Sequence, residues 1–110
     1  MANTYKILGQ SAPANTSNVD TYTVGAAKSA VISTIHIANV TGTAATARIF
    51  ARIAGAAASV GNALAYDVSV AANSFVALTE GMTLAATDVL TVQSGTGSAL
   101  TFTVFGNEIS

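Results

Sequence analysis

The chain has 110 residues and a formal net charge of −1, and only 8% of its residues are charged, where an ordinary soluble domain has about 25%. Its four basic residues are scattered along the sequence, whereas binding to nucleic acid or to an acidic membrane requires clustered Lys and Arg, so we expect neither as a partner. No run of about 18 apolar residues predicts a membrane-spanning segment, and no secretion signal is expected at the N-terminus.

Short β-like runs separated by turn clusters follow one another along the chain, as is typical of a β-sandwich or barrel. We expect strands at residues 5–10, 20–24, 30–40, 46–53, 64–70, 73–79, 82–84, 89–94 and 99–105. Alanine is abundant but shows no sustained 3.6-residue apolar period, so we expect no long helix. The predicted fold is all-β, a single antiparallel β-sandwich of about eight strands, either jelly-roll or Ig-like. It spans residues 1–110 and begins with a short N-terminal arm.

The clearest strand is the run at residues 30–40. Because side chains alternate between the two faces of a strand, Val31, Ile35 and Ile37 are predicted to share one face. Thr34 and His36 are predicted to lie on the opposite face. His36 is therefore expected at the surface or in an interface.

The predicted strand at residues 46–53 alternates between two faces in the same way. Its Ala and Ile residues, including Ile49 and Ile53, are predicted to face the core, while Arg48, Phe50 and Arg52 share the opposite face. Arg and aromatic residues are enriched at interfaces, so this face could bind carbohydrate, phosphate or a protein. The alternative is that the aliphatic stems of the two arginines cover Phe50 on a solvated face.

Three connecting segments and one strand have features of their own. Residues 55–62 are rich in Ala, Gly and Ser and are expected to form a flexible loop. The strand at 64–70 is predicted to bend near Asp67. A turn is expected at Glu80 and Gly81, and residues 95–98, Gly-Thr-Gly-Ser, predict a hairpin.

The side chains that catalysis or metal binding would need are sparse. His36 is the single histidine and there is no cysteine, whereas a metal site needs several converging ligands. A Ser-His-Asp triad would have to use His36, and no Gly-x-Ser-x-Gly turn presents a serine. We therefore expect no enzyme, no metal and no cofactor. The alternative is a small hydrolase that uses a pair among the five acids, although Glu80 and Asp88 stand in turn contexts where acids cap backbone amides.

The low charge content favours a surface that is partly covered in the working state, because interface cores are depleted in charged residues. The alternative is a monomer kept soluble by Thr, Ser, Asn and Gly. Both termini, residues 1–6 and 107–110, are predicted to be arms that reach neighbouring chains. His36 would join the arginine face if its strand pairs with the arginine strand. The candidate interface residues are Tyr5, Lys6, His36, Arg48, Phe50 and Arg52.

The residues that resemble a known group lie in seven segments spread over the chain, at 1–13, 22–24, 31–39, 48–55, 64–67, 81–89 and 105–109. The first reads Met-Ala-Asn-Thr-Tyr-Lys-Ile-Leu-Gly-Gln-Ser-Ala-Pro, and the last reads Phe-Gly-Asn-Glu-Ile. Together they resemble small virion proteins of tailed bacteriophages, especially phages of cyanobacteria and other aquatic bacteria. The resemblance carries no catalytic residues.

This resemblance implies a virion component that is made in the host cytoplasm. The expected function is that of a capsid decoration, or cement, protein whose partner is the major capsid protein. By analogy with other decoration proteins, a homo-oligomer is expected, with a trimer at a local three-fold position of the head. The alternative is a tail or fibre module that binds host sugars through loops such as residues 55–62 and 95–98.

Overall fold

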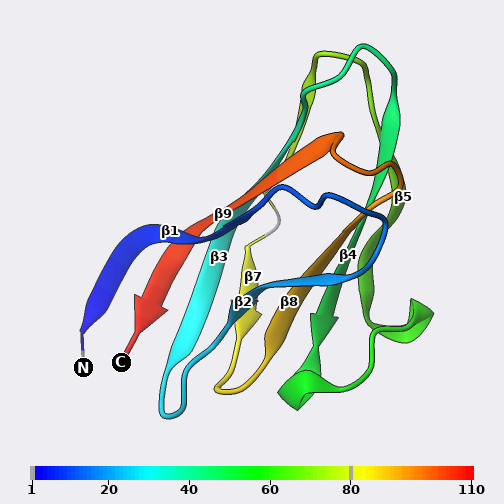
Figure 1. The fold of residues 1–110 in the computed structure, drawn as a ribbon. Coiled ribbons are helices and arrows are strands. Elements are labelled where there is room, and N and C mark those ends of the chain that lie inside the picture. The colour runs from blue at the N-terminus through cyan, green and yellow to red at the C-terminus, as the bar shows by residue number, and fades with distance from the viewer. Residues whose placement is uncertain (1, 80) are drawn as a thin grey trace.

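A computed structural model describes residues 2–79 and 81–110, and Met1 and Glu80 lie outside this part of the chain. Nine strands within it form two antiparallel sheets that face each other (Figure 1). The first sheet has the order β1-β9-β3-β6, and β7 also pairs with β3. Its strands are β1 (Asn3–Ser11), β9 (Leu100–Ile109), β3 (Ser29–Asn39), β6 (Phe75–Leu78) and β7 (Met82–Leu84). The prediction of an all-β sandwich is confirmed.

The second sheet has the order β2-β8-β4-β5. Its strands are β2 (Val19–Thr23), β8 (Val89–Ser94), β4 (Ala45–Arg52) and β5 (Ala63–Val70). Two short 3₁₀ turns, η1 (Ile53–Gly55) and η2 (Val60–Asn62), lie between β4 and β5. No helix in the described part of the chain is long and apolar enough to cross a membrane.

The pairing of the strands is nested from the termini inward. The first strand pairs with the last, β2 with β8, β3 with β6 and β7, and β4 with β5. This is the arrangement of a jelly roll, whereas an Ig-like sandwich would keep β1 and β2 in one sheet. The ninth strand arises because β6 and β7 pair with successive stretches of β3 and together fill the place of one strand.

The core lies between the two sheets and is built from alternate residues of each strand. Burial of a large aliphatic or aromatic side chain contributes about 1.5–3 kcal/mol relative to its exposure, so these residues dominate the stability of the sandwich. The largest fully buried apolar side chains are Phe102, Ile32, Ile35, Ile37, Ile49, Leu90, Leu100, Val24, Val70, Val92 and Val104.

A bulge in β3 changes the face on which one predicted core residue lies. Ile32 pairs with Gly106 and Thr34 with Phe105, so Ser33 is an inserted residue. The insertion shifts the alternation by one position, as a one-residue change of register does. Ile35 and Ile37 face the core as predicted, but the prediction for Val31 is wrong, because Val31 lies on the outer face.

The predicted bend in β5 is confirmed. Ala47 pairs with Val68 and Ile49 with Ala65, so one residue of β4 stands opposite two residues of β5. Asp67 is one of these two and has a φ of 61°. This left-handed conformation bends the strand and turns the carboxylate of Asp67 toward β4.

The end of β4 differs from the prediction. The strand ends at Arg52, and Ala54 (φ 51°) and Gly55 (φ 77°) adopt left-handed conformations in the turn that follows. Ile53 is consequently 77% exposed and does not share the core face with Ile49. Alternation would place Ile53 in the core only if β4 continued through it. The left-handed turn ends β4 one residue earlier, so Ile53 turns outward.

Residues 95–98 form a turn, but not the predicted hairpin. They connect β8 in one sheet to β9 in the other, and these two strands do not pair. Two glycines are needed here because the backbone passes close to other segments. A Cβ on Gly95 would collide with Thr46, and one on Gly97 would lie 2.8 Å from the carbonyl oxygen of Ala14.

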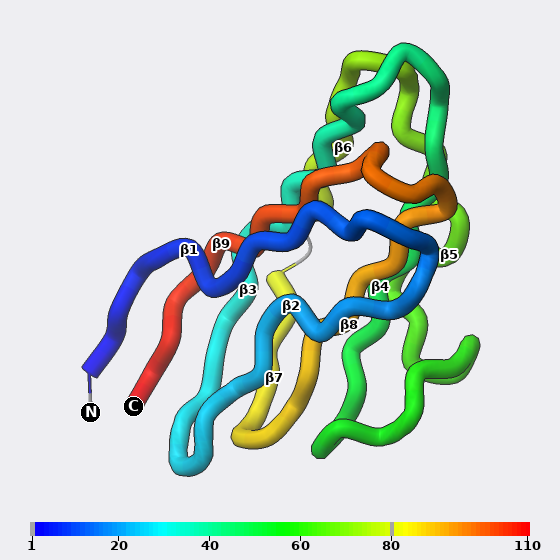
Figure 2. Tube along the Cα trace, viewed as in Figure 1, coloured from blue at the N-terminus to red at the C-terminus, as the bar shows by residue number. Residues whose placement is uncertain are grey.

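The chain termini lie side by side in the first sheet (Figure 2). Asn3 to Ile7 pair with Phe105 to Ile109, and Ala2 and Ser110 exchange two backbone hydrogen bonds of 2.9 Å. In the single chain, residues 2–6 and 107–110 therefore pair with each other, and their predicted reach to neighbouring chains stays a prediction. Met1, the first residue of the predicted arm, lies outside the described residues, as does Glu80 of the predicted turn.

Candidate functional site

The six predicted interface residues lie at separate places in the fold. Tyr5 and His36 are on the outer face of the β1-β9-β3-β6 sheet, and Lys6 is at the end of the gap between the sheets. The two arginines and Phe50 belong to β4 of the other sheet. His36 therefore does not join the arginine face, because β3 and β4 do not pair.

The outer face of the first sheet is apolar near the chain termini. Tyr5 is 80% exposed, and Ile7 is exposed beside Phe105, its partner across β1 and β9. Together with Val31 of β3 they line a hollow of about 620 Å³. An exposed apolar surface of this kind, which includes two aromatic rings, is typical of a site of protein contact.

The same face continues to the opposite edge of the sheet. His36 stacks on Phe75 with ring centroids 4.8 Å apart and an interplanar angle of 20°, and Phe75 itself is exposed. The prediction that His36 points away from Ile35 and Ile37 is confirmed. This stacked pair is a second aromatic feature of the sheet, formed by β3 and β6.

Formal charge is sparse on this sheet within the described residues. Lys6 and Glu108 are the only Lys, Arg, Asp or Glu residues in its five described strands; Lys6 lines the hollow, and Glu108 contacts Tyr22 of the other sheet. Oε2 of Glu108 accepts a hydrogen bond of 2.8 Å from the hydroxyl of Tyr22 on β2. Its Oε1 lies 3.3 Å from Nζ of Lys6 and 3.5 Å from Nζ of Lys28.

This cluster at the end of the sandwich shifts two pKa values. Burial is the main cause of the raised pKa of Tyr22, and the hydrogen bond and charge of Glu108 raise it further. The pKa of Glu108 is lowered first by the hydrogen bond from Tyr22, and then by Lys6 and Lys28. Lys6 therefore has an intramolecular role in the isolated chain, which its sequence position did not indicate.

Part of the outer face of the second sheet, around Phe50, is covered by the chain itself. Phe50 is only 4% exposed, because η2 contacts β4 and the loop between β4 and β5 folds back over this face. Gln93 of β8 donates a hydrogen bond of 2.8 Å to the carbonyl oxygen of Thr16, which holds the loop between β1 and β2 against the same face. Phe50, a predicted interface residue, is therefore largely buried in the single chain, and its role in an interface stays a prediction.

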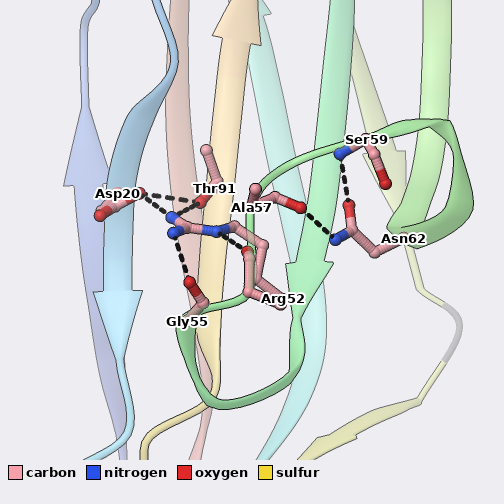
Figure 3. Close-up of polar contacts among 8 residues, drawn as sticks. Asp20, Arg52, Gly55, Ala57, Ser59, Asn62 and Thr91 are labelled. Atoms are coloured by element: carbon pink, nitrogen blue, oxygen red, sulfur yellow. Dashed lines mark hydrogen bonds and ion pairs between the residues drawn. The ribbon is translucent and has the colours of Figure 1, made fainter.

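Arg52 is the centre of a polar network that joins three parts of the chain (Figure 3). Its Nη1 donates hydrogen bonds to Asp20 at 2.7 Å and to Thr91 at 3.1 Å, and its Nη2 donates to the carbonyl oxygen of Gly55 at 2.9 Å. Its Nε donates to the carbonyl oxygen of Ala56 at 2.6 Å. Arg52 thus holds the fold together and is not available as a contact residue.

Among the β4 candidates, Arg48 lines two hollows and Phe50 lines one of them. Nε and Nη2 of Arg48 bind the two carboxylate oxygens of Asp67 at 2.7 and 3.1 Å, and its guanidinium carbon lies 3.9 Å from the centre of the Tyr66 ring. The hydrogen bond from Arg48 lowers the pKa of Asp67, and the same bond raises the pKa of Arg48. Hollows of about 480 and 330 Å³ flank the guanidinium.

Neither family models nor curated proteins give a match to this chain. The described residues contain no group of three or more His, Cys, Asp or Glu side chains placed to hold a metal ion. One sheet offers a mainly apolar hollow, and the other offers a polar cleft beside Arg48.

Several residues of these faces escaped prediction from sequence. Ile7, Val31, Phe105 and Phe75 come from four different strands, and only the strand order brings them onto one surface. The alternation of Tyr5 with Ile7 was the one local signal for the apolar face. Tyr66 had no such signal, because its contact with Arg48 depends on the bulge at Asp67.

Proposed function

We propose that this protein is a structural component of a tailed-phage virion. In this proposal it is a capsid decoration protein that docks on the lattice of the major capsid protein. The observation that carries the proposal is the outer face of the β1-β9-β3-β6 sheet, where Tyr5, Ile7 and Phe105 are exposed around a hollow whose one charged lining residue, Lys6, is paired with Glu108. Such a face is suited to contact with another protein surface, because interface cores are rich in aromatic residues and poor in charge.

The size of the apolar surface favours repeated binding by an oligomer. Burial of one large apolar side chain contributes about 1.5–3 kcal/mol, whereas association costs an estimated 4–15 kcal/mol or more. Three or four such side chains therefore give weak binding for a single copy. A symmetric homo-oligomer presents several faces at once and gains affinity through multivalency, which supports the trimer proposed by analogy with decoration proteins.

The fold is compatible with this assignment. Jelly rolls occur in viral capsid proteins, and they also occur in lectins and cupins, so the fold alone does not set the function. The resemblance of residues 1–13 and 105–109 to phage virion proteins points the same way. Both segments belong to β1 and β9, the strands that carry Tyr5, Ile7 and Phe105 on the apolar face.

A capsid-binding assay tests the proposal. Heads of the phage that encodes the chain, assembled without it, are sedimented with the purified protein. We expect saturable binding of the wild type and at least tenfold weaker binding of a variant that combines Ile7→Lys and Phe105→Lys. The matched control combines Ile53→Lys and Val60→Lys, which places the same two charges on exposed apolar residues between β4 and β5. Equal binding of all three proteins would exclude the apolar face as the docking surface.

A tail or fibre module is the second candidate, and the polar cleft beside Arg48 is the observation that favours it. Cryo-electron microscopy of the virion separates the two candidates. We expect density for the chain at three-fold or quasi-three-fold positions of the outer capsid. Density confined to the neck, tail or fibres would contradict the decoration proposal.

A further inference from the structure

We infer that the cleft beside Arg48, on the outer face of the β2-β8-β4-β5 sheet, binds a neutral oligosaccharide. The cleft encloses about 480 Å³, within the range of ligand sites in proteins. Its lining is mostly polar and includes Arg48, Tyr66, Gln93, Asn18, Ser17 and Ser59. The cleft lies on the sheet opposite the proposed docking face, so this inference does not depend on the proposed function.

The charges at the cleft favour a neutral ligand. Nε and Nη2 of Arg48 are both bound to the carboxylate of Asp67, and the two opposite charges cancel at the site. A phosphate or sulfate would need an uncompensated cation, which this pair does not provide. Nη1 of Arg48 has no hydrogen-bond partner among the described residues, so it can donate to a hydroxyl group of the ligand.

The remaining side chains suit the chemistry of a sugar ring. A sugar has an apolar face formed by its C–H groups and a rim of hydroxyls that both donate and accept hydrogen bonds. Tyr66 is 50% exposed and offers an aromatic surface beside Arg48. Asn18 and Gln93 offer carboxamides, and Ser17 offers a hydroxyl that donates or accepts. A neutral ligand with an apolar ring face and many hydroxyls satisfies all these groups together.

Hydrogen bonds hold the segments on both sides of the cleft. On one side, Nδ2 of Asn62 donates to the carbonyl oxygen of Ala57 at 3.0 Å, and the amide of Ser59 donates to Oδ1 of Asn62 at 3.0 Å (Figure 3). On the other side, the bond from Gln93 to Thr16 holds the loop between β1 and β2. A preformed cleft binds more tightly, because little conformational entropy is lost on binding.

The site is longer than one hollow. The second hollow, of about 330 Å³, also has Arg48 and Gln93 in its lining and adds Asp67, Thr16 and Thr46. The two hollows therefore lie next to each other, with Arg48 and Gln93 in the lining of both. This shape predicts a ligand of more than one sugar unit, which contacts Tyr66 in one hollow and the carboxylate of Asp67 in the other.

Nuclear magnetic resonance titration of the ¹⁵N-labelled full chain tests the inference. The probes are four neutral trisaccharides, maltotriose, cellotriose, chitotriose and β-1,4-galactotriose, with sodium sulfate as the anionic comparison. We expect at least one trisaccharide to give saturable shifts of the amides of Arg48, Tyr66 and Gln93. Sulfate should leave these amides unchanged.

Variants connect the shifts to the cleft. Tyr66→Ala and Gln93→Ala should each weaken binding of the responding trisaccharide at least tenfold. Tyr66→Phe keeps the ring, so its binding should stay within about threefold of wild type and shows that the position tolerates substitution. Tyr5→Ala, on the other sheet, is the matched control and should bind as wild type. Absence of shifts with every trisaccharide, unchanged binding by Tyr66→Ala and Gln93→Ala, or saturable sulfate binding at these amides would overturn the inference.

Discussion

The hydroxyl of Tyr22 on β2 donates a hydrogen bond of 2.8 Å to Glu108 on β9, and this bond joins the two sheets at the end where the chain termini meet. Lys6 and Lys28 approach the other oxygen of the same carboxylate. Side chains from both sheets and from the β2–β3 turn therefore depend on one acid. The stability of the fold should therefore depend on Glu108 at low pH and on Tyr22 at high pH.

Glu108→Gln keeps an oxygen that accepts the bond from Tyr22 but removes the negative charge. The pKa of Glu108 in the fold lies below its ordinary 4.5, so its contribution to stability is present above that pH and is lost as the pH falls through the folded value. We expect the variant to be less stable than wild type in urea at pH 7, with the difference shrinking toward pH 3. A difference that stayed constant over this range would show that the charge of Glu108 is not the cause.

Tyr22→Phe tests how the hydroxyl of Tyr22 affects the stability of the fold at high pH. The pKa of Tyr22 is raised in the fold, so between its ordinary value of 10.0 and the folded value the tyrosine is protonated in the native state and ionised in the unfolded state. The native state then binds more protons, and wild-type stability should fall as the pH rises above about 10. The variant lacks this ionisable group, so its urea midpoint should fall less between pH 9 and pH 11. Parallel curves for the two proteins would contradict this assignment.

The core of the sandwich was largely predictable from local pattern, and the exceptions have local causes. Ile35, His36 and Ile37 alternate as a half-buried strand requires, and the structure places them as predicted. Val31 was misplaced because the inserted residue, Ser33, has no distinct signal in the sequence. Because side chains alternate with a period of two, the sequence predicts which face of the sheet a residue lies on only up to the next bulge in the strand.

The interaction surfaces were less predictable, because they depend on contacts between residues far apart in the chain. The spacing of Arg48 and Arg52 indicates a shared strand face, but it does not reveal that Asp20 binds Arg52 from a strand 32 residues away. Similarly, Ile7 and Phe105 come together only through the pairing of the first and last strands. Strand order, which the sequence pattern left open between jelly-roll and Ig-like, decides both surfaces.

The two arginines of β4 should differ sharply in their effect on stability. Arg52 makes four hydrogen bonds and its side chain is 18% exposed, so Arg52→Met removes charged donors from Asp20, Thr91 and two backbone carbonyls. We expect a loss of about 2 kcal/mol in the free energy of unfolding. Arg48→Met is the matched control, because exposed ion pairs contribute little, and its loss should be much smaller. Urea denaturation at pH 7 measures both, and equal losses would refute the role of Arg52 in joining the strands and the loop.

The turn from β8 to β9 requires a glycine at position 95, because there is no room for a side chain there. A Cβ there would collide with the side chain of Thr46, while the same atom on Gly42 would meet nothing within 4 Å. Gly95→Ala should therefore lower the free energy of unfolding by about 1–3 kcal/mol, the usual cost of overpacking. Gly42→Ala serves as the control and should be neutral or slightly stabilising, because it restricts the unfolded chain without a clash. If Gly95→Ala is as stable as Gly42→Ala in urea, the close contact between this turn and β4 does not exist in solution.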